Sequence, residues 1–152
     1  MSRKFLIVLA AGGSAALLLG ALAFQHLGGL APCKMCIWQR YPHAVAIGLG
    51  AIAVFVPLSA LLALGALAAL TTAGIGAYHV GVEQGWWQGP TSCSSAPVGA
   101  LDAGALFDQI MTAPLVRCDE IAWQLAGISM AGWNMLISLA IAGLWLGALR
   151  AR

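Results

Sequence analysis

Long stretches without a charged residue are the feature that most constrains how this chain can fold. The stretch 5–24 contains no Asp, Glu, Lys or Arg, and neither does the much longer stretch 44–77. A helix crosses the hydrocarbon core of a membrane with about 20 apolar residues, so both stretches predict transmembrane helices. Charged residues make up only 8% of the 152 residues, far below the roughly 25% of soluble domains. We therefore expect a single membrane domain over residues 1–152.

The predicted fold is all-α, a bundle of four transmembrane helices. Pro57-Leu58-Ser59 marks a turn that divides the longest apolar stretch into two spans. The second span then has to begin somewhere between Cys36 and Pro42. For the first span a cleaved signal peptide is the alternative, because Ala21-Leu22-Ala23 resembles a cleavage site, but the apolar stretch is longer than a signal core. We expect spans at about 5–24, 40–57, 60–80 and 127–149.

Basic residues near both chain ends predict that both termini lie in the cytoplasm. Four spans agree with this orientation, which places segments 25–41 and 81–126 on the outer face. Aromatic residues gather near the outer helix ends, as in an interfacial belt: Trp38, Tyr41, Trp86, Trp87 and Trp123. The seven Lys and Arg residues form no basic stripe, which excludes nucleic-acid binding.

The outer segment 81–126 is long and polar for so small a protein, and long loops are commonly functional. Within it, Ala103, Leu106, Phe107 and Ile110 share one helical face. This pattern favours a short amphipathic helix lying on the membrane, with an irregular loop as an equally supported alternative.

Both outer segments carry cysteines, and no cysteine falls inside a predicted span. The four are Cys33, Cys36, Cys93 and Cys118. Paired cysteines in loops are typical of an oxidising compartment. Four cysteines allow three connectivities, and the C-x-x-C spacing favours a local bridge, which leaves Cys93 with Cys118.

The C-x-x-C pair suits redox chemistry better than a structural role, because its disulfide closes a tiny loop and restrains the unfolded chain little. At a helix start, the helix dipole and a cation one turn along, Arg40, favour a thiolate. Arg40 is equally explained as an arginine that snorkels to the interface. Cys93 and Cys118 alone would be a structural staple, but beside a redox pair they favour disulfide exchange.

Thiolates and imidazoles also bind metals, but Cys93 and Cys118 lie too far apart in sequence for a usual zinc motif. We expect no metal site. His79, at the end of the third predicted span, lies at the same membrane level as Arg40 and can help to bind a polar head group. A histidine satisfied at the rim of the bundle is the alternative.

The segment Pro32-Cys33-Lys34-Met35-Cys36-Ile37-Trp38-Gln39-Arg40 resembles the signature of the disulfide bond formation protein B (DsbB) family. The resemblance extends to Tyr78-His79, to the separated Cys93 and Cys118, and through segment 118–134. It therefore covers most of the chain. Its implication is an enzyme, a protein-disulfide oxidoreductase of the bacterial inner membrane that keeps the periplasm oxidising.

Carried over residue by residue, the resemblance implies that a DsbA-like partner attacks Cys93 and that Cys118 helps to resolve the mixed disulfide. Cys33 and Cys36 would then reoxidise that pair, with Cys36 facing a quinone, either ubiquinone or menaquinone. Arg40 would stabilise the charged thiolate, and His79 would line the quinone site. We expect a monomer; neither the quinone type nor a dedicated partner is distinguished by the sequence.

Two other classes of protein are alternatives. A vitamin K epoxide reductase-like oxidoreductase carries its C-x-x-C near the end of the last bundle helix, whereas here the motif precedes the second span. A non-enzymatic membrane scaffold with structural disulfides would tolerate replacement of Cys33 and Cys36 and would bind no quinone.

Overall fold

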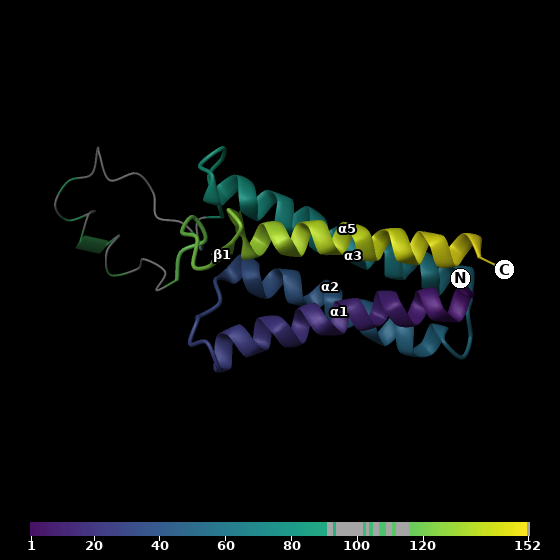
Figure 1. The fold of residues 1–152 in the computed structure, drawn as a ribbon. Coiled ribbons are helices and arrows are strands. Elements are labelled where there is room, and N and C mark those ends of the chain that lie inside the picture. Colours follow the sequence, from purple (N-terminus) through teal and green to yellow (C-terminus); the bar gives the residue numbers. More distant parts are fainter. Residues whose placement is uncertain are drawn as a thin grey trace.

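The computed structural model describes residues 1–90, 93, 102, 104, 107, 108, 111 and 116–151. These residues form four long helices and one short β-hairpin (Figure 1): α1 (Arg3–His26), α2 (Lys34–Ala53), α3 (Ser59–Glu83), β1 (Gln124–Leu125), β2 (Ile128–Ser129) and α5 (Met130–Arg150). α1, α3 and α5 are each long and apolar enough to cross a membrane. The chain is thus a mostly helical protein with the character of a multi-pass membrane protein. The predicted amphipathic helix falls mainly on residues outside the described part of the chain.

The helices form a bundle in which α2 and α5 each pack against both α1 and α3. Both chain termini lie at one end of the bundle, and the β-hairpin lies at the other (Figure 1). We call these the terminal end and the loop end. The start of α2 and the last turn of α3 also belong to the loop end, so segments far apart in sequence meet there.

Helix α2 differs from the second predicted span at both of its ends. It begins at Lys34, directly after Cys33, whose sulfur accepts a hydrogen bond from the backbone N–H of Cys36 at 3.2 Å. Pro42 lies inside the helix and does not end it. A proline removes only one backbone donor, and packing of α2 against two neighbours offsets that loss. The helix ends at Ala53, before the predicted boundary at Pro57.

Helix α5 begins at Met130, because the preceding residues form a hairpin, whose last three residues, 127–129, fall within the span expected at about 127–149. Gln124 pairs with Ser129, and Leu125 pairs with Ile128. Ala126 and Gly127 connect the strands with φ values of 53° and 77°, the left-handed backbone that two-residue hairpin turns require. Ser129 then caps α5, its hydroxyl accepting from the N–H of Gly132 at 3.2 Å.

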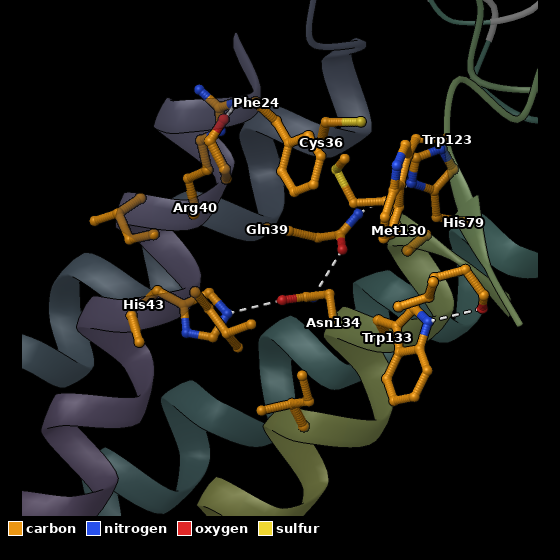
Figure 2. A pocket seen from close by; sticks show the side chains of 18 residues that line it. Phe24, Cys36, Gln39, Arg40, His43, His79, Trp123, Met130, Trp133 and Asn134 are labelled. Carbon is orange, nitrogen blue, oxygen red and sulfur yellow. Dashed lines mark hydrogen bonds between the residues drawn. The ribbon is translucent and has the colours of Figure 1, made fainter. Parts of the chain in front are cut away.

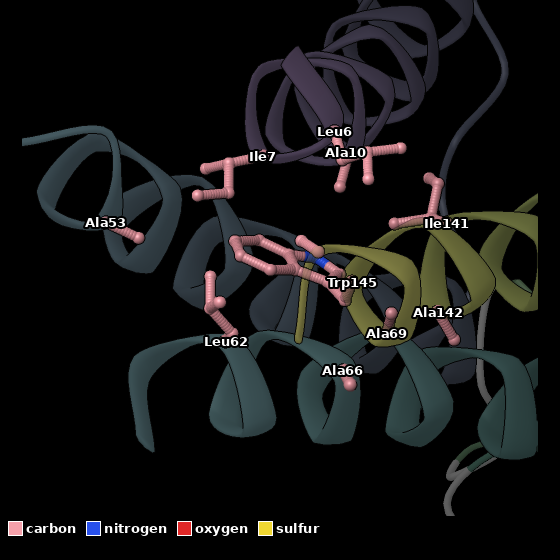
Figure 3. Packing of buried hydrophobic residues seen from close by; sticks show 11 residues of the cluster. Leu6, Ile7, Ala10, Ala53, Leu62, Ala66, Ala69, Ile141, Ala142 and Trp145 are labelled. Carbon is pink, nitrogen blue, oxygen red and sulfur yellow. The ribbon is translucent and has the colours of Figure 1, made fainter. Parts of the chain in front are cut away.

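The core of the terminal end is built around Trp145, which is fully buried. Figure 3 shows its ring between Ile7 of α1 and Leu62 of α3. Close approach of α3 depends on Gly65, where an added Cβ would lie 2.6 Å from the ring of Trp145. At the same end the guanidinium Nε of Arg3 donates to the carbonyl of Ala148 in the last turn of α5 and to that of Ala151, the residue after it, which joins the first helix to the last.

Candidate functional site

The four cysteines, which lie in two separate segments of the sequence, come together at the loop end. Cys93 and Cys118 form a disulfide with their Cα atoms 5.2 Å apart. Both are fully buried and pack, together with Cys33, against Met35 and Val82. The resemblance implies that a partner protein attacks Cys93, whereas in the structure Cys93 is buried. The physical reason is that an apolar disulfide gains more from this small hydrophobic cluster than from water.

Cys33 and Cys36 occupy the entrance to α2, with their sulfur atoms 2.6 Å apart. Cys33 is buried, and Cys36 is half-buried at the wall of a large cavity. The sulfur of Cys33, the sulfur of Cys118 and a ring nitrogen of His79 all lie within 4.8 Å of one another. Cys33 therefore lies between Cys36 and the neighbouring disulfide, close to both.

The two sulfurs of the C-x-x-C pair are electrostatically unequal. The hydrogen bond with Cys36 and burial raise the pKa of Cys33 well above its usual range. Cys36 instead lies in the first turn of α2, where the helix dipole favours a negative charge. Of the two, Cys36 is thus the sulfur that more readily carries the thiolate.

The large cavity has a volume of about 370 Å³ and opens beside Cys36. Its walls are mostly apolar and come from all four helices and the β-hairpin, with His79 as the contribution of α3 (Figure 2). Its polar lining consists of Gln39, Arg40, His43, His79 and Asn134. A mostly apolar cavity with a few convergent polar groups is typical of a site for a small lipophilic molecule.

Arg40 lines this cavity together with Cys36, as its position one turn along α2 predicts. Its Nη1 donates to the side-chain oxygen of Gln25 at 2.6 Å, and its Nη2 donates to the carbonyl of Ala21 at 3.4 Å. Its Nε is buried and has no hydrogen-bond partner among the described residues. A buried donor without a partner is costly, so a ligand oxygen at this position would be stabilised.

A chain of hydrogen bonds runs through the polar lining, from His43 to His79. Asn134 accepts from His43 Nε2 at 2.9 Å and donates to Gln39 Oε1 at 2.7 Å (Figure 2). Gln39 Nε2 lies 3.3 Å from the carbonyl oxygen of Met35, which can only accept, so the amide orientation is defined. The same Nε2 donates to His79 Nδ1 at 3.0 Å. In the neutral ring, His79 therefore carries its proton on Nε2, the nitrogen that faces Cys33.

Three polar residues at this end were not predicted as site residues from the sequence: Gln39, Glu83 and Asn134. Gln39 lies inside the C-x-x-C-Ile-Trp-Gln-Arg signature, and Asn134 ends the segment 118–134 that carries the resemblance. Glu83 has no such signal beyond being an acidic residue at the end of an apolar stretch. Its carboxylate accepts from the hydroxyl of Ser129 at 2.5 Å and lies 3.9 Å from His79 Nε2.

Cys33, His79 and Cys118 also have the mutual distances of a metal site. The sulfur of Cys118 is bonded to Cys93, however, and a disulfide sulfur lacks the thiolate character that metal ligation requires. The donor set of this cluster therefore fits disulfide exchange better than metal binding.

The sequence model of the family described as "Disulfide bond formation protein DsbB" matches residues 3–148. The chain belongs to the DsbB family. A curated disulfide bond formation protein B from Verminephrobacter eiseniae is 39% identical over 90% of this chain and 80% of its own length. Relatives of the same name from Polaromonas naphthalenivorans and Stutzerimonas stutzeri are 34% and 32% identical and cover 97% and 95% of this chain, and 90% and 94% of their own lengths. No solved structure matches.

Membership of the DsbB family implies an oxidoreductase that takes part in disulfide bond formation. The match covers α1, α2, α3, all but the last two residues of α5 and both cysteine segments, so it includes every residue of the site described above.

Proposed function

We propose that this protein is a quinone-dependent thiol oxidase that reoxidises a DsbA-like periplasmic protein through two redox-active disulfides. The observation that carries the proposal is the position of Cys33. Its sulfur lies within 4.8 Å of Cys118 in one disulfide and 2.6 Å from Cys36, which lines the large cavity. Electrons thus have a continuous sulfur path from the outer pair to the cavity.

The exchange steps follow from thiolate chemistry. A partner thiolate attacks Cys93, and Cys118 leaves as a thiolate. Cys118 then attacks Cys33 in the inner disulfide, which releases Cys36 as a thiolate at the cavity wall. The second partner thiol completes the partner's own disulfide and frees Cys93, which reforms the bond with Cys118 and releases Cys33. Because Cys93 is buried, the first attack requires the outer disulfide to become exposed.

The residues of the large cavity fit a quinone. The apolar walls suit the ring and the start of an isoprenoid tail, and the unpartnered Nε of Arg40 offers a donor to a carbonyl oxygen. His79 lines the same cavity and adds a further polar group to its wall. When bound, a quinone supplies a two-electron acceptor. Such an acceptor suits the task, because a DsbA-type couple near about −120 mV is regenerated only by a stronger oxidant.

We further propose that α2 crosses the membrane with the other three helices, as a single domain and as a monomer. These spans lie along α1, α2, α3 and α5; of the bounds expected from the sequence, about 5–24, 40–57, 60–80 and 127–149, residues 54–57 and 127–129 fall outside the helices. Both termini would lie in the cytoplasm and the cysteines on the periplasmic face of the bacterial inner membrane. The basic residues at the terminal end and the position of the cysteine cluster at the opposite end support this orientation.

The test is anaerobic mixing of the purified protein with a reduced DsbA-like protein and a soluble quinone, monitored by quinone absorbance. We expect the wild type to reduce the quinone and Cys36→Ser to leave it oxidised. If the wild type, with both cysteine pairs intact, also left the quinone oxidised, the oxidase proposal would fail and the scaffold alternative would gain support.

A further inference from the structure

A second, smaller cavity of about 60 Å³ lies on the outer side of the cysteine cluster. Cys33, His79 and Glu83 line it together, although Glu83 takes no part in the sulfur exchange described above. The side chain of Glu83 is only 5% exposed. A carboxylate buried next to a reacting sulfur is costly unless it is stabilised, so its position calls for an explanation.

The proton balance of the reaction provides that explanation. Oxidation of two thiols to a disulfide releases two electrons and two protons. The two electrons pass to the quinone, which becomes quinol by taking up two protons. Cys36 favours its thiolate, whereas the raised pKa of Cys33 means that Cys33 keeps its proton at neutral pH. Cys33 must therefore lose a proton when its sulfur bonds to Cys36.

His79 Nε2 connects the candidate donor and acceptor of that proton. It lies 3.6 Å from the sulfur of Cys33 and 3.9 Å from Glu83 Oε1. Since Gln39 occupies Nδ1, the single N–H of the neutral ring is directed to the side of the ring where both of these atoms lie. The N–H can stabilise either the Glu83 carboxylate or the Cys33 thiolate.

We propose that Glu83 is the base that takes the proton of Cys33 when the Cys33–Cys36 disulfide reforms. His79 relays the proton. Its Nε2–H proton passes to Glu83, where an O–H bond forms, and Nε2 takes the proton of Cys33 as the S–H bond breaks, so the ring ends in the same tautomer. In the reverse direction Glu83 returns a proton to Cys33 when that sulfur is released. The inference rests on the proposed function, which supplies the quinone as oxidant.

The surroundings of Glu83 favour a proton exit on this side. The hydroxyl of Ser129, capping α5, donates to the carboxylate and fixes its orientation. Arg117 and Glu120 line the outer wall of the cavity and are exposed. The other ionisable groups that face the cavity are Cys33, Cys36, Arg40 and His79.

The experiment measures single-turnover quinone reduction in detergent, from pH 5.5 to 9. The protein used has Cys33 and Cys36 reduced and the Cys93–Cys118 disulfide intact. In Glu83→Gln we expect a loss of about a hundredfold at pH 6, in the range typical of a lost general base. The loss should shrink as pH rises, because hydroxide then replaces Glu83 as the acceptor of the Cys33 proton. Glu83→Asp should recover part of the rate, and Asp119→Asn, which removes a carboxylate that does not line this cavity, should behave as wild type.

A second measurement separates a base from a merely structural residue. In a Cys36→Ser background with the outer disulfide intact, Cys33 is the free thiol, and its alkylation by iodoacetamide reports its thiolate fraction. Glu83→Gln removes a negative charge beside that thiolate, so alkylation should be as fast or faster although turnover is slower. A wild-type rate and pH profile in Glu83→Gln overturns the inference, as does a parallel loss of turnover and alkylation that Glu83→Asp does not recover. Failure of wild type itself to reduce quinone would instead contradict the proposed function.

Discussion

The two ends of the bundle are built on opposite principles. At the terminal end the cluster around Trp145 consists of buried apolar side chains, and Gly65 brings α3 against the indole ring. At the loop end the same helices enclose a cavity of about 370 Å³ and bury Gln39, His43 and His79 in a chain of hydrogen bonds. The difference indicates that packing at one end holds the helices while the other end keeps space and polar groups for chemistry.

The largest effect on activity should come from interrupting disulfide exchange between the two cysteine pairs at the loop end. Cys118→Ser leaves Cys93 without its partner, so transfer from a DsbA-like protein should fall by roughly a thousandfold or more. Reduction of the quinone by a small dithiol, which reaches Cys33 and Cys36 directly, should persist. Stopped-flow absorbance with the two reductants measures both rates. Equal losses with both reductants would mean that the two pairs do not have separate roles.

The next largest effect is on stability and concerns the terminal end alone. Trp145→Ala removes the central ring of the apolar cluster and should lower the free energy of unfolding by about 3–5 kcal/mol. Unfolding in mixed micelles followed by circular dichroism measures this change. The folded fraction should retain its quinone reduction; an equal loss of specific activity would show that the two ends are coupled.

Arg40→Lys tests the polar side of the cavity while keeping the charge. Lysine lacks both the planar fork and an atom equivalent to the buried Nε, so we expect quinone reduction to fall by roughly a hundredfold, as when a positioned donor is lost. Stability should change little, which unfolding in micelles verifies. A wild-type rate in Arg40→Lys would mean that Arg40 has no role in quinone reduction and only extends its charge to the membrane interface.

The smallest expected effect compares two glycines of α3. Gly65→Ala places a Cβ 2.6 Å from the ring of Trp145 and should cost about 1–3 kcal/mol by overpacking. Gly74→Ala meets nothing within 4 Å and should be neutral or stabilising by up to about 1 kcal/mol. Thermal unfolding of the two variants in one detergent tests the pair. Similar losses in both would contradict the tight contact at Gly65.

Much of the helical architecture is predictable because uncharged stretches have few alternatives in a membrane. The apolar stretches locate α1, α3 and most of α5, and Pro57 correctly indicates the turn after α2. The hairpin before α5 was missed because its turn carries Ala126 and Gly127 in place of the usual Asn-Gly or Asp-Gly signal. Pro42 favoured a start of the second span near this residue, but in the structure α2 begins earlier and continues through the proline.

The candidate site was predictable to a different extent. The cysteine spacing and the cation after it are local in sequence, so Cys33, Cys36 and Arg40 could be named as candidates from the sequence, and the structure places Cys36 and Arg40 on one cavity. The hydrogen-bond chain joins residues that lie far apart in sequence, such as Gln39 and Asn134, and the direction of each bond depends on how an amide is turned. Only the folded chain defines that orientation, and with it the proton position on His79.

The most direct test of the account is to trap the exchange between the two cysteine pairs. In a double variant, Cys36→Ser with Cys93→Ser, the remaining cysteines are Cys33 and Cys118, whose sulfur atoms lie within 4.8 Å of each other. Mild oxidation followed by peptide mass spectrometry should find them joined in one disulfide. Two separately alkylated thiols in a correctly folded protein would contradict the proposed electron path.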